Sequence, residues 1–463
     1  MSLMVSISGI RGIVGSTLTP EVVVRYASAF AEYCDRGRIV IGRDGRITGK
    51  SIGQLVSSTL LQMGCDVTAL GICPTPTVAL AVEKTKAAGG ISITASHNPM
   101  VWNGLKFFGP TGLFLDAEEN RAFWKIADEP PRTYTPWNKQ GKHTLLESFL
   151  EDHVKAVLSL PSIHPETIRK RRFKIVLDCV NAAGGIIVPR LLKELGCAVY
   201  EMNCDVSGVF SHTPEPIPEN LAELCRRVRK EKADLGIAVD PDVDRLVLID
   251  ERGEPFGEEY TIANVVKFVL EKEKSAGSRT KVRGSKSVVV NLSTTRAVED
   301  IASAYGYRTV RTPVGEINVA KKMKEIGAIV GGEGSGGVIL PKVHLGRDAL
   351  VGIALTLQHL TDFGGPVSEL KKTMPQYLIT KGKVELGKIN ADRVLDRIQK
   401  KFAAKGIIST GDGLKIDFPE SWVHLRKSNT EPIVRIIAEA HEKRIADKLV
   451  KDFTREIKST GAG

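Results

Sequence analysis

Residues 38–46 read RIVIGRDGR, and they open the pattern that decides the fold. This apolar run, rich in β-branched residues, ends in polar residues and precedes the amphipathic stretch 51–63. Gly64 follows that stretch, and a second apolar run fills residues 65–71. A glycine directly after a helix can adopt the left-handed conformation that ends it, and short apolar runs suit buried parallel strands. The stretch therefore predicts a strand–helix–strand unit.

The same order of strand, helix, glycine and strand recurs twice. Residues 174–203 repeat it around Gly196, and residues 287–313 repeat it around Gly306. Three such units predict three similar α/β domains. The C-terminal part differs, because residues 414–440 read as three strands that precede a charged amphipathic helix, which predicts a smaller α+β domain. The predicted domains are residues 1–150, 151–255, 256–370 and 371–463.

Composition limits the class of protein and of ligand. The chain has 463 residues, of which 42% are hydrophobic and 26% are charged, as in ordinary globular proteins. Lys and Arg exceed Asp and Glu by 65 to 54, and this net charge of +11 favours anionic ligands. Aromatic residues make up only 6% and no nucleic-acid-binding motif occurs, so phosphorylated metabolites are favoured over DNA or RNA.

Targeting and redox signals point to the cytoplasm. The sequence shows neither a charged-then-apolar leader nor a run of about 18 apolar residues, so we expect a cytoplasmic protein without membrane contact. Its seven cysteines include no C-x-x-C pair, and several lie in apolar segments. They are therefore expected to be reduced, buried thiols.

The segment ITASHNP, residues 93–99, sets a hydroxyl and an imidazole side by side after an apolar run. Pro99 prevents a helix from continuing through this turn. A serine on such a constrained turn can be a cap, a nucleophile or a phosphate carrier, and the segment alone leaves all three open. Ser96 and His97 are therefore candidate site residues.

The segment DPDVDR, residues 240–245, follows an apolar strand and carries three alternating carboxylates. Carboxylates this close repel one another unless a cation lies between them, and hard oxygen ligands suit Mg²⁺. Asp240, Asp242 and Asp244 are therefore the candidate metal ligands, with a solvated acidic turn as the alternative. An EF-hand loop fits poorly, because Arg245 stands where that loop needs glycine.

The segment GGEGSGGVILP, residues 331–341, formally contains a dinucleotide-binding fingerprint. That interpretation is weak, because an apolar run ending at Pro341 replaces the helix that must follow the glycines. Glu333 and Ser335 are better suited to hydrogen-bonding sugar hydroxyls. A tight hairpin turn is the alternative.

The segment LRKSNTEPIVR, residues 425–435, collects guanidinium groups, hydroxyls and turn amides. Arginine binds a phosphate dianion through two parallel hydrogen bonds, and turn N–H groups can point at it. The segment therefore predicts a phosphate-binding loop, with an exposed basic turn as the alternative. Its candidate residues are Arg426, Ser428, Asn429, Thr430 and Arg435.

Taken together and in this order, these segments resemble the α-D-phosphohexomutase family over essentially the whole chain. The matching motifs are SGIRG at 8–12, TASHNP at 94–99, NGLK at 103–106, DPDVDR at 240–245, TPVGE at 312–316, GEGSGG at 332–337 and RKSNTEPIVR at 426–435. The resemblance implies three α/β domains with mixed sheets and a smaller α+β domain around a central cleft. It also implies a phosphosugar substrate and a monomer or homodimer.

The resemblance assigns roles to individual residues. It implies that Ser96 carries a phosphoryl group, which passes through a hexose 1,6-bisphosphate that is both intermediate and activator. One Mg²⁺ would be held by Ser96, Asp240, Asp242 and Asp244. Arg11, His97, Lys106 and Arg245 would surround the transfer, with Lys106 and His97 as the acid/base candidates. The substrate-binding residues would be Gly315, Glu333, Ser335, Arg426, Ser428, Asn429, Thr430 and Arg435.

Three departures from the family pattern lie on the substrate side. Many relatives have histidine at the position of Gly337, a basic residue at that of Ile317 and glycine at that of Asn429. We therefore expect a phosphoglucomutase/phosphomannomutase that interconverts hexose 1- and 6-phosphates, with phosphoglucosamine mutase as the main alternative. A dehalogenase-type phosphatase, in which Asp240 would be the nucleophile, is a remote alternative.

Overall fold

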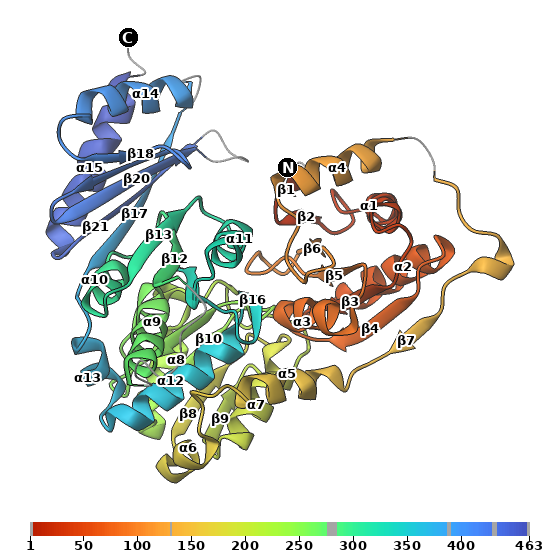
Figure 1. Cartoon of the computed structure of the whole chain (residues 1–463), viewed down its shortest axis with the longest axis horizontal. Coiled ribbons are helices and arrows are strands. Elements are labelled where there is room, and N and C mark those ends of the chain that lie inside the picture. Colours follow the sequence, from red (N-terminus) through yellow and green to blue (C-terminus); the bar gives the residue numbers. More distant parts are fainter. Residues whose placement is uncertain (1–2, 130–131, 276–284, 387–389, 428–432, 461–463) are drawn as a thin grey trace.

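The computed structural model describes residues 3–129, 132–275, 285–386, 390–427 and 433–460. Four sheets follow one another along the chain. In Figure 1 the corresponding parts lie along an arc, from the red and orange N-terminal part to the blue C-terminal part. The sequence-based prediction of three α/β domains and a smaller α+β domain is confirmed.

The N-terminal domain is a seven-stranded sheet with helices on both faces. Its strand order is β1 (Met4–Ser6), β2 (Gly9–Ile13), β6 (Trp102–Phe108), β5 (Gly89–Ile93), β3 (Ile39–Arg43), β4 (Val67–Ile72) and β7 (His143–Leu145). Its helices are α1 (Pro20–Tyr33), α2 (Gly49–Gln62), α3 (Thr75–Thr85) and α4 (Ala117–Asp128). Side chains of β3 alternate between the faces: Ile39 and Ile41 pack in the core formed with α1, α2 and α4, whereas Val40 packs with α3.

The second domain has four strands, and the third has five. The second contains, in sheet order, β11 (Leu246–Ile249), β10 (Leu235–Val239), β8 (Lys174–Asp178) and β9 (Ala198–Met202), with helices α5 (Phe149–Leu158), α6 (Pro165–Arg171), α7 (Gly184–Glu194) and α8 (Ala222–Glu231). The third contains β13 (Arg308–Thr312), β12 (Ser287–Asn291), β14 (Val330–Glu333), β15 (Gly337–Leu340) and β16 (His344–Arg347). Its helices are α9 (Glu258–Ser275), α10 (Ala297–Ala304), α11 (Glu316–Ile326), α12 (Ala349–Phe363) and α13 (Val367–Lys372).

The fourth domain is an antiparallel sheet covered by two helices. Its strands are β17 (Leu378–Glu385), β21 (Ile433–Ala440), β20 (Ser421–Lys427), β19 (Leu414–Phe418) and β18 (Ile407–Ser409), and its helices are α14 (Ala391–Phe402) and α15 (Lys443–Thr460). The predicted boundary at residues 370 and 371 falls inside α13. The predicted boundary at residues 150 and 151 falls inside α5, and the one at 255 and 256 falls between β11 and α9.

The three strand–helix–strand units form as the sequence predicts. Each pair of flanking strands is parallel, namely β3 with β4, β8 with β9, and β12 with β13. The glycine after each helix has a left-handed φ, which is 90° at Gly64, 70° at Gly196 and 75° at Gly306. Only glycine adopts this conformation without a steric cost, so each glycine ends its helix and returns the chain to the sheet.

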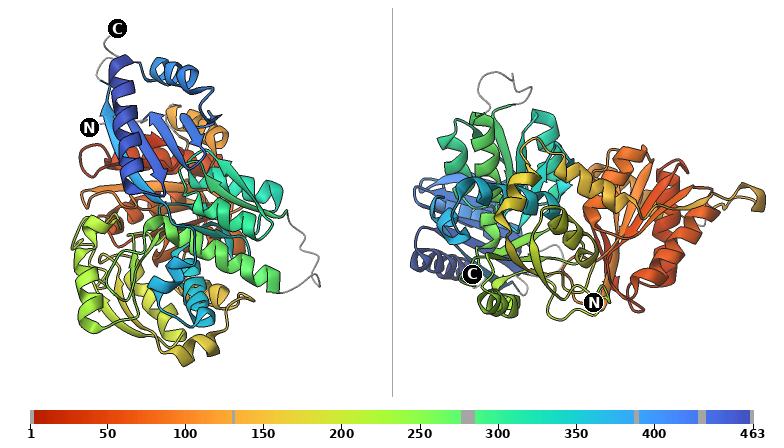
Figure 2. Two further views of the ribbon diagram at one scale, coloured as in Figure 1. Left: turned by 90° about the vertical axis from the view of Figure 1, so that its left-hand side faces the viewer. Right: turned by 90° about the horizontal axis from the view of Figure 1, so that it is seen from below.

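The four domains differ in how they are joined. One apolar cluster contains side chains of the first three domains, from Val40 to Tyr377. The first domain has a second apolar cluster of its own, and the fourth domain has a separate core. In the left view of Figure 2 the blue C-terminal sheet and helices lie at the upper end of the molecule. Within the described ranges, no helix is long and apolar enough to span a bilayer, and all seven cysteines are free.

Candidate active site

Loops from all four domains converge on one cleft with a cavity volume of about 290 Å³. Several follow the carboxyl ends of parallel strands, which is where open α/β sheets bind ligands. Ser96 follows β5, Ser293 follows β12, and Glu333 ends β14. The polar lining residues are Ser8, Arg11, Ser96, Lys106, Arg245, Glu259, Asn291, Ser293, Glu316, Glu333, Ser335, Arg347, Lys381 and Arg426.

Ser96 lies at the floor of the cleft in an unusual backbone conformation. Its φ is +47°, and its side chain is buried. The hydroxyl donates a hydrogen bond to Oδ2 of Asp240 at 3.0 Å and lies 3.3 Å from Nδ1 of His97. The sequence-predicted serine loop and carboxylate loop, 144 residues apart, therefore meet at this hydroxyl.

Arg46 holds the serine loop in place, and the sequence analysis missed it. Its guanidinium donates to the carbonyl oxygens of Ser96 at 2.6 Å and Asn98 at 2.7 Å, and to two further carbonyls of the loop. Its Nε pairs with Asp44 at 3.0 Å, and neither side chain is accessible to solvent. Thr94 donates to the same carboxylate at 2.7 Å. Five contacts from one buried guanidinium fix the turn that carries the hydroxyl.

The three aspartates of the predicted metal loop lie together and are buried. Asp240, Asp242 and Asp244 bring carboxylate oxygens to within 4.8 Å of one another. One oxygen of Asp242 accepts from Thr75 at 2.7 Å and from Lys106 at 2.6 Å. Among the described residues, the Oδ1 atoms of Asp242 and Asp244 have no hydrogen-bond partner. Buried, unsatisfied carboxylate oxygens are costly, so this donor set fits a hard cation such as Mg²⁺.

The pKa values of Asp240 and Asp244 are shifted in opposite directions. Burial and the charges of Asp244 and Asp242 raise the pKa of Asp240 well above its usual range. Burial would also raise the pKa of Asp244, but the cationic groups of Arg347 and Lys106 hold it well below that range. Without a cation, repulsion among the carboxylates disfavours the ionisation of all three groups. A bound cation would offset this repulsion.

The predicted cations and acid/base candidates surround Ser96. Burial would lower the pKa of Lys106, but Asp242 and Asp244 raise it, so the ammonium stays charged. Burial and the charges of Arg245 and Arg11 lower the pKa of His97 to about 2, so its imidazole is neutral. Arg11 also donates to the side-chain oxygen of Asn98 in the serine loop at 3.1 Å.

On the sugar side of the cleft, Glu333 is tightly held. One carboxylate oxygen accepts from the side chain of Asn291 at 2.8 Å and from the backbone of Gly315 at 3.0 Å. The other accepts from Arg347 at 2.9 Å. Ser335 lies in the turn between β14 and β15, and no helix follows the glycines, as the sequence predicts. Arg347 was not identified from the sequence.

The fourth domain contributes a basic edge to the cleft. Arg426 on β20 lines it and forms an ion pair with Asp412 at 2.8 Å. Arg435 on β21 is the direct cross-strand neighbour of Arg426, but its side chain is exposed and does not line the cleft. Lys381 on β17 also lines the cleft, although the sequence analysis did not select it. The predicted residues Ser428, Asn429 and Thr430 lie outside the described residues.

Comparison with known protein families decides the identity of the fold. Models of the phosphoglucomutase/phosphomannomutase domains match the chain in order: alpha/beta/alpha domain I at residues 4–132, domain II at 151–253 and domain III at 261–377. The family's C-terminal domain matches residues 381–456. The chain belongs to this phosphohexomutase family. The resemblance inferred from the sequence motifs is thereby confirmed.

Individual phosphohexomutases are similar over nearly the whole chain. A probable phosphoglucosamine mutase from Methanopyrus kandleri is 35% identical over 448 residues, which cover 96% of either chain. A phosphoglucomutase/phosphomannomutase from Thermococcus kodakarensis is 35% identical over 441 residues, covering 93% of either chain. The crystal structure of a phosphoglucomutase/phosphomannomutase family protein from Burkholderia thailandensis superposes with a TM-score of 0.84 at 26% identity, covering 99% of either chain.

Proposed function

We propose that this phosphohexomutase interconverts the 6-phosphate and 1-phosphate of a hexose through a phosphorylated Ser96. The observation that carries the proposal is the hydroxyl of Ser96, which lies at the floor of a cationic cleft and 3.0 Å from a buried carboxylate loop. The dehalogenase-type alternative gains no support, because both oxygens of Asp240 already accept hydrogen bonds, from Ser96 and from backbone N–H groups of the metal loop.

The proposed reaction consists of two transfers. In the first, the bond between phosphorus and Oγ of Ser96 breaks and Oγ takes up a proton, while a bond from phosphorus to the free sugar hydroxyl forms and that hydroxyl loses its proton to a base. The resulting 1,6-bisphosphate reorients in the cleft. In the second transfer the bond between the other phosphorus and its sugar oxygen breaks, a bond to Oγ of Ser96 forms as the serine hydroxyl loses its proton, and the departing sugar oxygen takes up a proton. Phosphates and protons balance over the cycle.

The residues around Ser96 suit these transfers. Phosphoryl transfer depends mainly on positioning and charge stabilisation rather than on a strong base. Arg11, Lys106 and Arg245 supply positive charge, and neutral His97 can accept the hydroxyl proton, more readily once a phosphate on Ser96 raises its pKa. Asp240, Asp242, Asp244 and the phosphate of Ser96 would hold Mg²⁺, which supplies neutralisation of charge on the transferring group.

For the sugar, we propose glucosamine phosphate, the alternative of the sequence analysis, in place of its first choice, glucose or mannose phosphate. The sugar side of the cleft presents the carboxyl groups of Glu259, Glu316 and Glu333 beside the cationic groups of Arg347 and Lys381. The carboxylate of Glu333 can accept a hydrogen bond from an ammonium group on the sugar. The name of the relative from Methanopyrus kandleri supports the same choice.

Glucose and mannose phosphates remain the second candidate, supported by the name of the Thermococcus kodakarensis relative. Turnover of glucosamine, glucose and mannose 1-phosphates, each with Mg²⁺ and a trace of the matching bisphosphate, separates the two. We expect the highest kcat/KM for the glucosamine compound. A preference for glucose or mannose would establish the second candidate, and no turnover of any of the three would contradict the proposed function.

A further inference from the structure

Gly337 lies in a strand where its backbone does not require glycine. It is a residue of β15 and is not among the glycines with left-handed φ. A Cβ atom at this position would lie 2.3 Å from Cδ and 3.0 Å from Cγ of Arg347. The glycine therefore provides room for the side chain of Arg347.

Arg347 uses this room to connect three loops. Its guanidinium contacts Glu333 of the sugar loop at 2.9 Å, Glu316 at the start of α11 at 3.0 Å, and Asp244 of the metal loop at 2.7 Å. A planar guanidinium can direct separate N–H donors at three carboxylates, which a lysine ammonium cannot reproduce with the same geometry. The side chain cannot move away from an added Cβ without losing these contacts.

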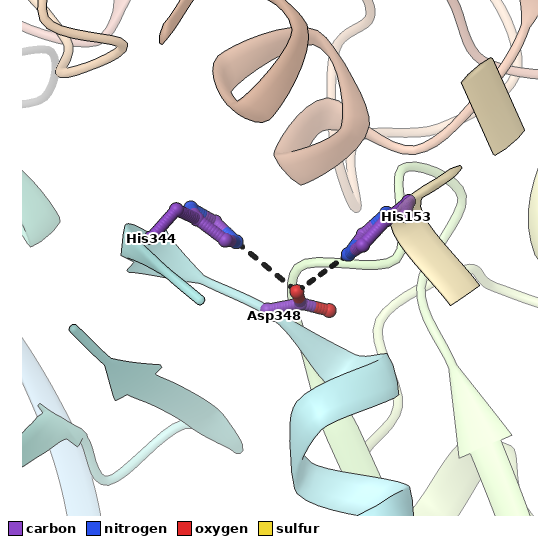
Figure 3. A group of neighbouring side chains, drawn as sticks. All are labelled: His153, His344 and Asp348. Atoms are coloured by element: carbon purple, nitrogen blue, oxygen red, sulfur yellow. Dashed lines mark hydrogen bonds and ion pairs between the residues drawn. The ribbon is translucent and has the colours of Figure 1, made fainter. Parts of the chain in front are cut away.

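Asp348, the residue after Arg347, fixes the backbone from which the arginine side chain projects. Asp348 accepts hydrogen bonds from His153 at 2.8 Å and His344 at 3.0 Å, as Figure 3 shows, and it also caps α12. His153 lies on α5, and its other ring nitrogen is 2.9 Å from the hydroxyl of Thr77 on α3. Thus Arg347 projects from a point that is tied both to the first domain and to the third.

Glu333 has one acceptor position left for a ligand. An ionised carboxylate offers about four lone-pair positions, and Asn291, Gly315 and Arg347 occupy three of them. The remaining position is on the oxygen that also accepts from Arg347. The direction in which Glu333 meets a sugar hydroxyl or ammonium group therefore depends on Arg347.

We propose that Arg347, in the space left by Gly337, is a positioning residue that orients Glu333 for the sugar ring. The inference rests on the proposed function, because it takes the bound ligand to be a sugar phosphate. This positioning role differs from phosphate binding, because the guanidinium of Arg347 already contacts three carboxylates. Its loss should therefore weaken contacts to the sugar and leave contacts to a bare phosphate unchanged.

The test is calorimetry on full-length protein in a Ser96→Ala background, with glucosamine 6-phosphate and inorganic phosphate as separate ligands. Arg347→Ala should weaken glucosamine 6-phosphate binding about ten- to a hundredfold, the range expected for losing one charge-assisted hydrogen bond, and should leave phosphate binding unchanged. Gly337→Ala should weaken sugar-phosphate binding by about tenfold. Combining both substitutions should weaken it no further than Arg347→Ala alone.

Matched controls separate this effect from general damage. Arg252→Ala removes a half-exposed arginine paired with Asp250, and Gly411→Ala adds a Cβ where no atom lies within 4 Å. Neither should change binding. Should Arg347→Ala fail to fold, Arg347→Lys keeps the charge without the three-way geometry and should still weaken sugar-phosphate binding several-fold.

Three results would overturn the inference. The first is unchanged sugar-phosphate binding in a folded Arg347 variant, and the second is an equal loss for inorganic phosphate, which would make Arg347 a phosphate ligand. The third is a loss in the double variant equal to the product of the single losses, which would mean that Gly337 and Arg347 act independently. If the Ser96→Ala parent binds phosphate but no sugar phosphate, the proposed function itself is contradicted, and the inference falls with it.

Discussion

At the scale of single residues, Ser96, the proposed phosphate carrier, is held in a backbone conformation that is unfavourable for a residue other than glycine. A non-glycine residue with a left-handed φ costs roughly 1–2 kcal/mol. The φ of Ser96 is held at +47° because the guanidinium of Arg46 donates hydrogen bonds to carbonyl oxygens of its loop. Strain at a functional residue persists only where the surroundings enforce it, and here one buried arginine does so.

Arg46 should therefore matter for stability and for the serine loop. Replacing it with methionine leaves Asp44 buried without its partner, which should cost on the order of 3–5 kcal/mol of unfolding free energy. Chemical denaturation measures this cost. Arg38→Met is the control, because Arg38 is exposed and, among the residues that the structure describes, makes a single hydrogen bond of 3.4 Å, to the carbonyl of Thr85. Equal stability of the two variants would contradict the role assigned to Arg46.

Sequence reasoning selected cleft residues that lie in distinctive loops and did not select those in less distinctive segments. Ser96 and Asp240 stand in segments whose composition makes them candidate site residues. Arg46 and Arg347 do not, because an arginine after a strand looks like an ordinary surface residue. Their importance arises from contacts 50 and 103 residues away, to Ser96 and Asp244 respectively, and no local pattern encodes such contacts.

At the scale of elements, local sequence patterns predict the longer helices and strands but not those that depend on pairing with distant segments. The strand–helix–strand units were predictable because glycine stops and apolar runs are local signals. The short edge strands β1 and β7 were not predicted. They have three residues each and owe their assignment to pairing with β2 and β4. Such strands carry too few residues to show an alternating pattern.

The contact between the third and fourth domains includes a buried histidine, His424. His424 on β20 is buried, lies 2.9 Å from the hydroxyl of Ser293 and donates to the carbonyl of Asp412. Burial is the main cause that lowers its pKa from 6.5 to about 4. The unfolded chain therefore binds a proton below pH 6.5 that the folded protein does not bind until near pH 4.

Stability should accordingly fall as the pH drops from about 6.5 to 4, by roughly 3 kcal/mol from this one residue. Above pH 6.5 the imidazole is neutral in both states and contributes no pH dependence. The difference between the denaturation midpoints at pH 7.5 and pH 5 should be smaller for His424→Gln than for the unmodified protein. The exposed His143 of β7, changed to Gln, is the control and should leave the pH dependence intact. An unaltered pH dependence in His424→Gln would contradict the assignment.

At the scale of the whole molecule, the arrangement of domains matches the demands of the proposed reaction. One apolar cluster joins the first three domains, so the elements that carry the serine loop, the metal loop and the sugar loop pack against one another. The fourth domain has a separate core and reaches the cleft with Arg426 and Lys381. This arrangement suits a ligand whose one phosphate binds to the basic residues of the fourth domain while its other end reacts in the first three domains.

The central claim is that phosphate moves between Ser96 and both ends of one sugar. The most direct measurement labels the enzyme with radioactive hexose 1,6-bisphosphate and Mg²⁺, maps the label by peptide analysis, and then adds unlabelled sugar 6-phosphate. The account predicts label on the peptide that contains Ser96, followed by its transfer into bisphosphate and then into both monophosphates. Label on the peptide that contains Asp240, or its release as inorganic phosphate without transfer to sugar, would contradict the account.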